Sequence, residues 1–211
     1  MVELLTILVL VFSAISIVLM VQLRRARIQG EALHNRITEL NIREKLLQAQ
    51  ASHDSLTGLG NRTLLADRFF FAVERAKRNQ KPFAIAMIDL NDFKSVNDDY
   101  GHVAGDGVLV VTAKRLVDSV RASDTVSRLG GDEFVLLMES FEGTQDLVHI
   151  GRKLIETLSQ EIALETGERV KVGASVGFAL YPNDGTDMND LLHIADKSMY
   201  DCKSSGLMGL G

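Results

Sequence analysis

Two strand-like runs flank a Gly-Gly-Asp tripeptide in the stretch "SRLGGDEFVLLM", residues 127–138. Glycine accepts the positive backbone angles of tight turns, and the large and β-branched residues on either side favour strands. The stretch therefore predicts a β-hairpin, which makes two strands antiparallel neighbours in whatever sheet contains them. Its turn carries two adjacent carboxylates, Asp132 and Glu133.

Helix and strand patterns alternate through the rest of the chain after residue 51. Apolar residues spaced three or four apart predict helices over about 64–78, 105–120, 144–160 and 187–204. Continuous or alternating apolar runs predict strands at 83–90 and 168–180. Because helices interrupt several strands and one pair is a hairpin, we expect an α+β fold, with a mostly antiparallel central sheet flanked by helices.

The N-terminal segment from residue 4 to residue 23 contains no charged residue. At ~1.5 Å per residue, a helix of this length spans the ~30 Å hydrocarbon layer of a membrane. Glu3 precedes the run and no small-residue cleavage site follows it, which argues against a cleaved signal peptide. Arginines at 24, 25 and 27 favour the cytoplasmic side. We therefore expect residues 1–23 to be a single-pass transmembrane anchor, with the remainder in the cytoplasm.

Residues 24–52 are expected to form a helical linker, because they lack proline and are rich in Arg, Glu, Gln and Leu. Apolar residues recur at heptad spacing, at Ala26, Leu33, Ile37, Leu40 and Leu47. Two hypotheses remain open: a short coiled coil that dimerises the chain, and a solvated helix with an apolar stripe.

The charge balance bears on the class of ligand. Residues 51–211 carry 17 Lys and Arg against 24 Asp and Glu, so they lack the basic surface of a protein that binds a nucleic acid polymer. A phosphate ligand would then need a metal ion to balance its charge.

A third carboxylate, Asp89, ends the predicted strand 83–90. If this strand neighbours the hairpin, Asp89, Asp132 and Glu133 converge on one sheet edge. A hard divalent ion would neutralise such a cluster, and oxygen ligands favour Mg²⁺ or Mn²⁺. Gly130 and Gly131 would let a phosphate approach the backbone closely. Taken alone, the Gly-Gly-Asp-Glu turn would favour an ordinary exposed hairpin over a metal site.

The polar stretch between these carboxylates, residues 89–106, offers groups suited to a nucleotide. Lys94 can neutralise phosphate charge, and Asn97 and Asp106 present the donor and acceptor groups that a guanine edge requires. The alternative is a solvated loop in which Asp106 begins a helix.

Five segments occur in order and together closely resemble the GGDEF diguanylate cyclase family: "HDSLTGLGNR", "IDLNDFKSVNDDYGHVAGD", "RLGGDEF", "ASVGFAL" and "ADKSMYDCKSSG". The resemblance covers about residues 51–206, and it assigns 53–211 to a GGDEF domain. It implies a fold similar to the polymerase palm and the class III nucleotidyl cyclases. It also implies a bacterial, membrane-anchored homodimer that joins two GTP molecules into cyclic di-GMP.

The resemblance implies the site roles as well. Asp89, Asp132, Glu133 and the carbonyl of Leu90 look like ligands of Mg²⁺ or Mn²⁺, and Glu133 also looks like the base for the 3′-hydroxyl. Lys94 would stabilise phosphate charge. The substrate-binding residues would be Asn97, His102, Asp106, Gly130, Gly131 and Lys203, although His102 is also suited to packing.

A second site is implied by "RASD", in which Arg121 and Asp124 stand where the family carries a product-binding inhibitory site. Arg121 can bind phosphate or a guanine edge with two hydrogen bonds. Arg152 is a possible supplement from the following helix. The alternative is an ion pair at a helix end.

The sequence departs from the family pattern at Asn91, where Asp is common, at Gly60, where Pro is common, and at Leu207, where a basic residue is common. The first two are mild changes, whereas Leu207 removes a basic contact to the triphosphate. The alternative function is a non-catalytic membrane-tethered receptor for cyclic di-GMP or GTP. Intact Asp89, Lys94, Asp132 and Glu133 favour the enzyme, and Leu207 favours the receptor.

Overall fold

The computed structural model describes residues 20, 22, 24–25, 27, 29–31, 34–40, 52–205 and 209–210. The chain divides into two compact units, Met1–Gln50 and Ala51–Gly211. Among the described residues, no helix is both long and apolar enough to cross a membrane. The predicted anchor lies outside the described residues, apart from Met20 and Gln22.

The described residues of the first unit are helical. Two of the predicted heptad residues, Ile37 and Leu40, are described, and each is 50% exposed. The other three, at 26, 33 and 47, lie outside the described residues. The coiled coil therefore stays a prediction, with an apolar stripe on the described helix that a partner helix could cover.

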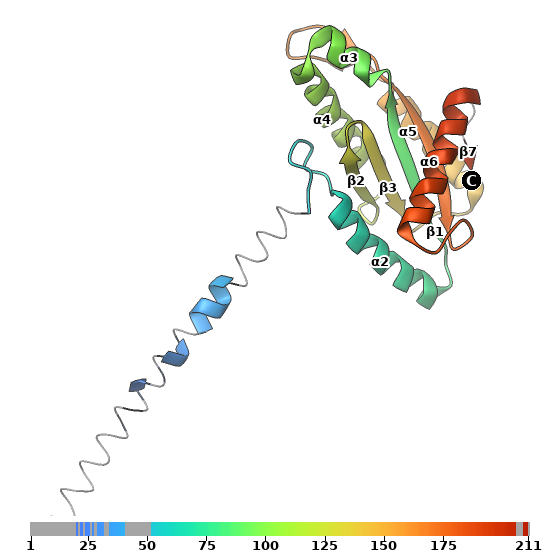
Figure 1. Cartoon of the computed structure of the whole chain (residues 1–211). Helices are drawn as coiled ribbons and strands as arrows, with labels where there is room; N and C mark the ends of the chain where they lie inside the picture. Colours follow the sequence, from blue (N-terminus) through green and yellow to red (C-terminus); the bar gives the residue numbers. More distant parts are fainter. Residues whose placement is uncertain are drawn as a thin grey trace, which may run out of the picture. The chain divides into compact units, whose positions relative to one another are not determined.

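The second unit is built on a five-stranded sheet (Figure 1). Its strands lie in the order β2 (Thr125–Gly130), β3 (Glu133–Met138), β1 (Phe83–Asn91), β6 (Gly173–Tyr181) and β7 (Gly209–Leu210). All neighbours are antiparallel except β6 and β7, which are parallel. A separate small sheet pairs β4 (Ile162–Ala163) with β5 (Arg169–Val170). The predicted hairpin and the mostly antiparallel sheet are confirmed.

Helices cover both faces of the sheet. One apolar cluster joins α2 (Arg62–Asn79) and α6 (Met188–Ser205) to the sheet. The cluster on the other face joins α3 (Phe93–Tyr100), α4 (His102–Ser119) and α5 (Thr144–Leu158). Successive side chains of β1 alternate between the two clusters, so this strand is buried on both faces and reads as a continuous apolar run. The predicted α+β fold with flanking helices is confirmed.

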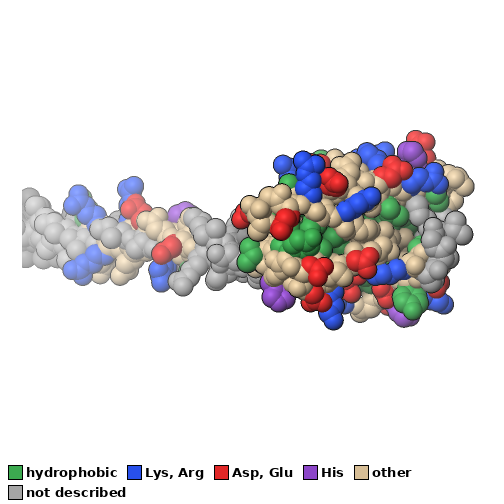
Figure 2. All heavy atoms as spheres, turned by 90° about the horizontal axis from the view of Figure 1, so that it is seen from above, with side chains coloured by type: hydrophobic (Ala, Val, Ile, Leu, Met, Phe, Trp, Pro, Cys, Tyr) green, Lys and Arg blue, Asp and Glu red, His purple; other side chains and the backbone are tan. Residues whose placement is uncertain are grey.

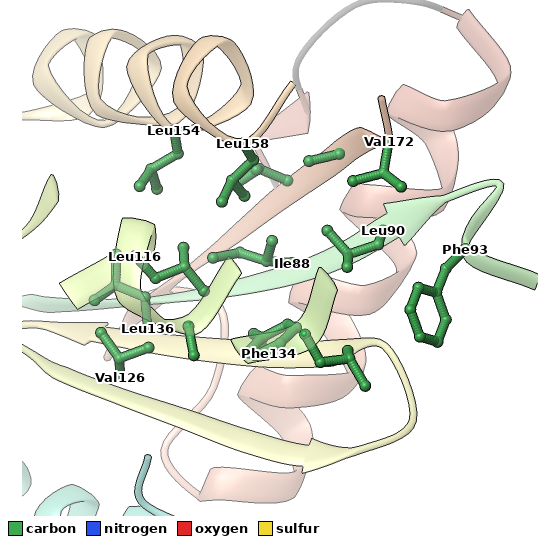
Figure 3. Close-up of a cluster of buried hydrophobic side chains, with 14 of the residues drawn as sticks. Ile88, Leu90, Phe93, Leu116, Val126, Phe134, Leu136, Leu154, Leu158 and Val172 are labelled. Carbon is green, nitrogen blue, oxygen red and sulfur yellow. The ribbon is translucent and has the colours of Figure 1, made fainter. Parts of the chain in front are cut away.

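The cluster beneath the hairpin explains the phenylalanine that follows its two carboxylates. Phe134 is fully buried, and Figure 3 shows it beside Ile88 of β1, with Leu116 of α4 and Leu158 of α5 in the same cluster. Strand alternation therefore sends Glu133 and Phe134 to opposite faces, the first toward solvent and the second into the core.

Two expectations for the secondary structure were wrong. The polar stretch after Asp89 was expected to stay a loop until about residue 105, but α3 fills it and α4 begins at His102. Only Phe93 and Val96 of α3 are buried, so its apolar stripe is too short to read. The strand expected over 168–180 is broken into β5 and β6, because the backbone changes its pairing partner from β4 to β1.

Candidate active site

Carboxylates from two neighbouring strands meet at one edge of the main sheet. The antiparallel register of β1 and β3 sets Asp89 directly opposite Glu133, and Asp132 precedes Glu133 in the hairpin turn. Like charges directly opposite each other on neighbouring strands repel. The structure thus brings the predicted metal-binding carboxylates together at an electrostatic cost.

Besides burial, the repulsion between these carboxylates contributes to a raised pKa of Glu133. Burial raises the pKa of Glu133 above its usual value, and the negative charges of Asp196, Asp89 and Asp132 raise it further. Asp196 comes from α6 and was not among the predicted site residues. No local pattern in the sequence marks Asp196, because it reaches Glu133 only through the packing of α6 on the sheet. A carboxylate with a raised pKa is stabilised in its charged form by a nearby cation, and carboxylate oxygens suit Mg²⁺ or Mn²⁺.

Lys203 supplies a cation at one of these carboxylates. Its Nζ lies 2.6 Å from Oδ1 of Asp89, whose side chain is 17% exposed. In the part of the chain that the structure describes, no group of three or more His, Cys, Asp and Glu side chains is arranged to hold a metal ion. The Lys203 ammonium balances the charge of Asp89. Lys203, which was predicted to reach the triphosphate, thus lies beside the carboxylates of the candidate site.

The hairpin turn presents bare backbone beside the carboxylates. Gly130 and Gly131 have φ angles of +151° and +53°, which side chains rarely tolerate. A Cβ added to either glycine would meet no described atom within 4 Å. The turn is therefore open to a ligand. The side chain of Leu90 is 1% exposed, so any ligand role of this residue falls to its backbone carbonyl.

The remaining predicted substrate residues lie on α3 and α4. Lys94 and His102 are exposed near the starts of α3 and α4, respectively. The side chain of Asn97 lies so close to Gly105 that a Cβ there would be 2.0 Å from its Oδ1. Asn97 thus lies at the junction of the two helices, and Asp106 follows Gly105 on α4.

Asp106 also lines a hollow of about 600 Å³ between α4 and the loop joining β4 to β5. Most of its other lining is apolar, including Leu56, Tyr100, Val103 and Val110. An apolar hollow with a carboxylate at its margin suits a flat base that also offers hydrogen-bond donors.

The predicted inhibitory pair follows α4. The backbone N–H of Arg121 donates to Oδ2 of Asp124 at 3.0 Å, and the Arg121 guanidinium donates to the carbonyl of Ser140 at 3.0 Å. Both residues line a hollow of about 460 Å³, in which Arg152 takes no part. Burial raises the pKa of Asp124, and the contacts with Arg121 only partly offset this. The alternative of a helix-end ion pair is replaced by a backbone contact that leaves the guanidinium exposed.

The departures from the family pattern have different outcomes. Asn91 is integrated into the sheet, because its Oδ1 accepts a hydrogen bond from Ser175 Oγ at 3.0 Å. Leu207 lies outside the described residues.

Charged side chains of both signs are interspersed over the face shown in Figure 2, with acidic side chains around a small apolar patch.

Comparisons with known proteins identify the family of the domain. Residues 51–208 match the family described as "Diguanylate cyclase, GGDEF domain". The chain is 40% identical over 203 residues to the bifunctional diguanylate cyclase/cyclic di-GMP phosphodiesterase MucR of Pseudomonas aeruginosa, covering 96% of this chain and 29% of MucR. It is also 40% identical over 157 residues to the diguanylate cyclase TpbB of the same organism, covering 74% of this chain and 36% of TpbB.

A solved structure of the GGDEF domain of TpbB superposes with a TM-score of 0.70 at 38% identity, covering 75% of this chain and 92% of that chain. The chain thus spans about a third or less of the two full-length relatives but nearly all of the isolated domain. On the fold, the sheet-edge carboxylates and the match over residues 51–208, the chain belongs to the GGDEF diguanylate cyclase domain family.

Proposed function

We propose that this chain is a diguanylate cyclase, which condenses two GTP molecules into cyclic di-GMP and releases two pyrophosphates. The observation that carries the proposal is the placement of Asp89 opposite Glu133 beside a turn of bare glycine backbone. Two relatives at 40% identity, MucR and TpbB, are named for this activity.

In this function Glu133 is the general base. It accepts the proton of a 3′-hydroxyl as that oxygen attacks the α-phosphorus of a second GTP, and the bond to pyrophosphate breaks. The pKa of Glu133 is raised by burial and by three neighbouring carboxylates, which makes its carboxylate a stronger proton acceptor.

Asp89, Asp132, Glu133 and the carbonyl of Leu90 are the groups that would hold Mg²⁺ or Mn²⁺. A divalent ion bound there supplies Lewis-acid stabilisation of the phosphoryl and leaving-group oxygens. Lys203 then serves the triphosphate, since its ammonium already lies at this cluster. Lys94 neutralises further phosphate charge from the exposed surface of α3.

Asn97 and Asp106 recognise the guanine edge, while the apolar hollow beside Asp106 holds the face of the base. His102 lies exposed at the start of the same helix, in reach of a nucleotide bound there. Guanine is favoured over adenine because a carboxylate accepts hydrogen bonds from the N1 and N2 groups that only guanine presents.

Each domain binds one GTP in this proposal, so two domains must face each other for the reaction, and a homodimer is required. The exposed Ile37 and Leu40 of the first unit support a dimerising stalk. The uncharged run over residues 4–23 supports an anchor in a bacterial cytoplasmic membrane, with the catalytic domain in the cytoplasm.

The direct test is to incubate the purified full-length protein with GTP and Mg²⁺ and to measure cyclic di-GMP by mass spectrometry. Product that disappears on chelation of the metal supports the cyclase. A folded dimer that binds cyclic di-GMP and makes none would contradict it and identify a receptor.

Product inhibition is proposed at Arg121 and Asp124. Arg121→Ala is expected to raise the cyclic di-GMP concentration needed for half-inhibition by about tenfold or more, because it removes a charge-assisted contact worth ~1.5–3 kcal/mol. Initial rates at increasing added product measure the shift. Inhibition identical to wild type would show that this turn is only structural.

A further inference from the structure

The first residues of the second unit form a closed turn, which we call the N-terminal turn (residues 52–61). Its backbone folds back on itself, with hydrogen bonds from Asp54 N–H to the Leu59 carbonyl at 2.8 Å and from Asn61 N–H to the Ser52 carbonyl at 2.9 Å. Inside it, Oδ1 of Asp54 accepts hydrogen bonds from the backbone and the hydroxyl of Thr57, at 2.8 and 2.6 Å. These two hydrogen bonds alone fix the direction of the Asp54 carboxylate.

Arg128 of β2 joins this turn to the hairpin. Its Nη1 donates to both carboxylate oxygens of Asp54, at 3.0 and 3.2 Å. Its Nε and Nη2 both donate to the carbonyl of Gly131, at 3.0 and 2.8 Å. Its backbone N–H donates to the carbonyl of Gly60 at 2.8 Å, so side chain and main chain hold the same turn.

The Gly131 carbonyl belongs to the peptide that leads into Asp132. Because a peptide unit is planar, holding this oxygen also fixes the direction of the Asp132 N–H and of the chain that enters Glu133. The turn needs such support, since Gly130 and Gly131 have no side chains and accept many backbone angles. A guanidinium is suited to it, because its planar fork donates to two acceptors at fixed angles.

The pair is protected from water more than a surface ion pair is. The side chains of Arg128 and Asp54 are 11% and 22% exposed. Burial alone would raise the pKa of Asp54, but the hydrogen bonds from Thr57 and Arg128 outweigh it and hold this pKa below its usual value. The carboxylate is therefore ionised at neutral pH, where it can pair with the Arg128 guanidinium.

We propose that Arg128 is a positioning residue of the active site, and that with Asp54 it clamps the tip of the catalytic hairpin to the N-terminal turn. The inference rests on the proposed cyclase activity.

The test compares Asp54→Asn and Arg128→Lys with wild type in the full-length protein. Both should lower kcat by about tenfold to a hundredfold, since a displacement of about 1 Å in a reacting group costs on this order. The KM for GTP should change by less than about threefold, because neither residue is among those proposed to bind the nucleotide. Arg128→Lys keeps the charge but replaces the three guanidinium nitrogens that reach Asp54 and Gly131 with a single ammonium nitrogen.

Glu139→Gln is the matched control. It breaks the ion pair between Arg75 and Glu139, whose side chains are 42% and 20% exposed and which joins α2 to the residue after β3. It should leave kcat within about twofold of wild type, because surface and half-buried pairs contribute mainly to stability. Assays well below the melting temperature of every variant separate kcat from unfolding.

Hydrogen–deuterium exchange of the hairpin, residues 125–138, gives a second readout that needs no turnover. Asp54→Asn and Arg128→Lys should each speed exchange at the tip severalfold, the double variant no more than the worse single variant, and Glu139→Gln not at all. Wild-type kcat with unchanged exchange in either clamp variant would overturn the clamp. If wild type makes no cyclic di-GMP, the proposed function fails, and exchange alone still decides whether the clamp exists.

Discussion

Replacing Glu133 with glutamine is expected to lower the rate of cyclic di-GMP synthesis by about a hundredfold to ten-thousandfold, the range typical of a lost general base. Glutamine has nearly the same shape but cannot take the proton of the 3′-hydroxyl. It also removes one of the charges that repel each other around Asp89. We therefore expect the melting temperature to stay the same or to rise while activity is lost, measured by initial rates and thermal unfolding of the same samples.

This combination separates a catalytic role from a structural one. Glu142→Gln makes the same chemical change on an exposed carboxylate after β3 and should leave both quantities near their wild-type values. Turnover of Glu133→Gln within tenfold of wild type would remove Glu133 from the mechanism. A large fall in melting temperature would instead show that the carboxylate supports the fold.

Sequence patterns predicted the elements in which apolar side chains recur at regular spacing along a long buried surface. β1 was readable because both of its faces are buried, and α2 because Leu65, Phe69, Ala72 and Ala76 lie on one side. The break between β5 and β6 was not readable. Val170, Val172 and Ala174 all point into one core cluster, so the alternation continues across a change of hydrogen-bonding partner.

The candidate site was predictable where a motif lies in one continuous segment. The hairpin turn and the Asp89 strand end are local, and the register of β1 and β3 then places them together. Asp196 and the contact between Arg128 and Asp54 were not predictable, because each depends on segments far apart in the sequence meeting through the sheet. A charged residue carries no local sign of the distant partner that it meets.

The close approach of Gly177 of β6 to α6 was likewise not predictable from the sequence. Its replacement should nevertheless have the largest effect on stability. A Cβ at this position would lie 2.1 Å from the backbone N of Met199 and 2.3 Å from the backbone O of Ala195. These two atoms stand four residues apart on α6, the spacing of a helical hydrogen bond, so no side-chain rotation relieves the contact. Gly177→Ala is expected to lower the free energy of unfolding by about 3 kcal/mol or more, measured by chemical denaturation.

The same change should also reach the active site. Because α6 carries Asp196 toward Glu133 and Lys203 onto Asp89, pushing α6 off the sheet separates both from the cluster. We therefore expect a higher KM for GTP in whatever fraction of Gly177→Ala stays folded. Gly107→Ala is the control for stability alone, since its Cβ would meet no described atom within 4 Å and alanine favours the helix by up to ~1 kcal/mol. Its KM for GTP is not compared, because Gly107 lines the hollow proposed to hold the base. Equal stability of the two variants would show that α6 does not need its close approach to β6.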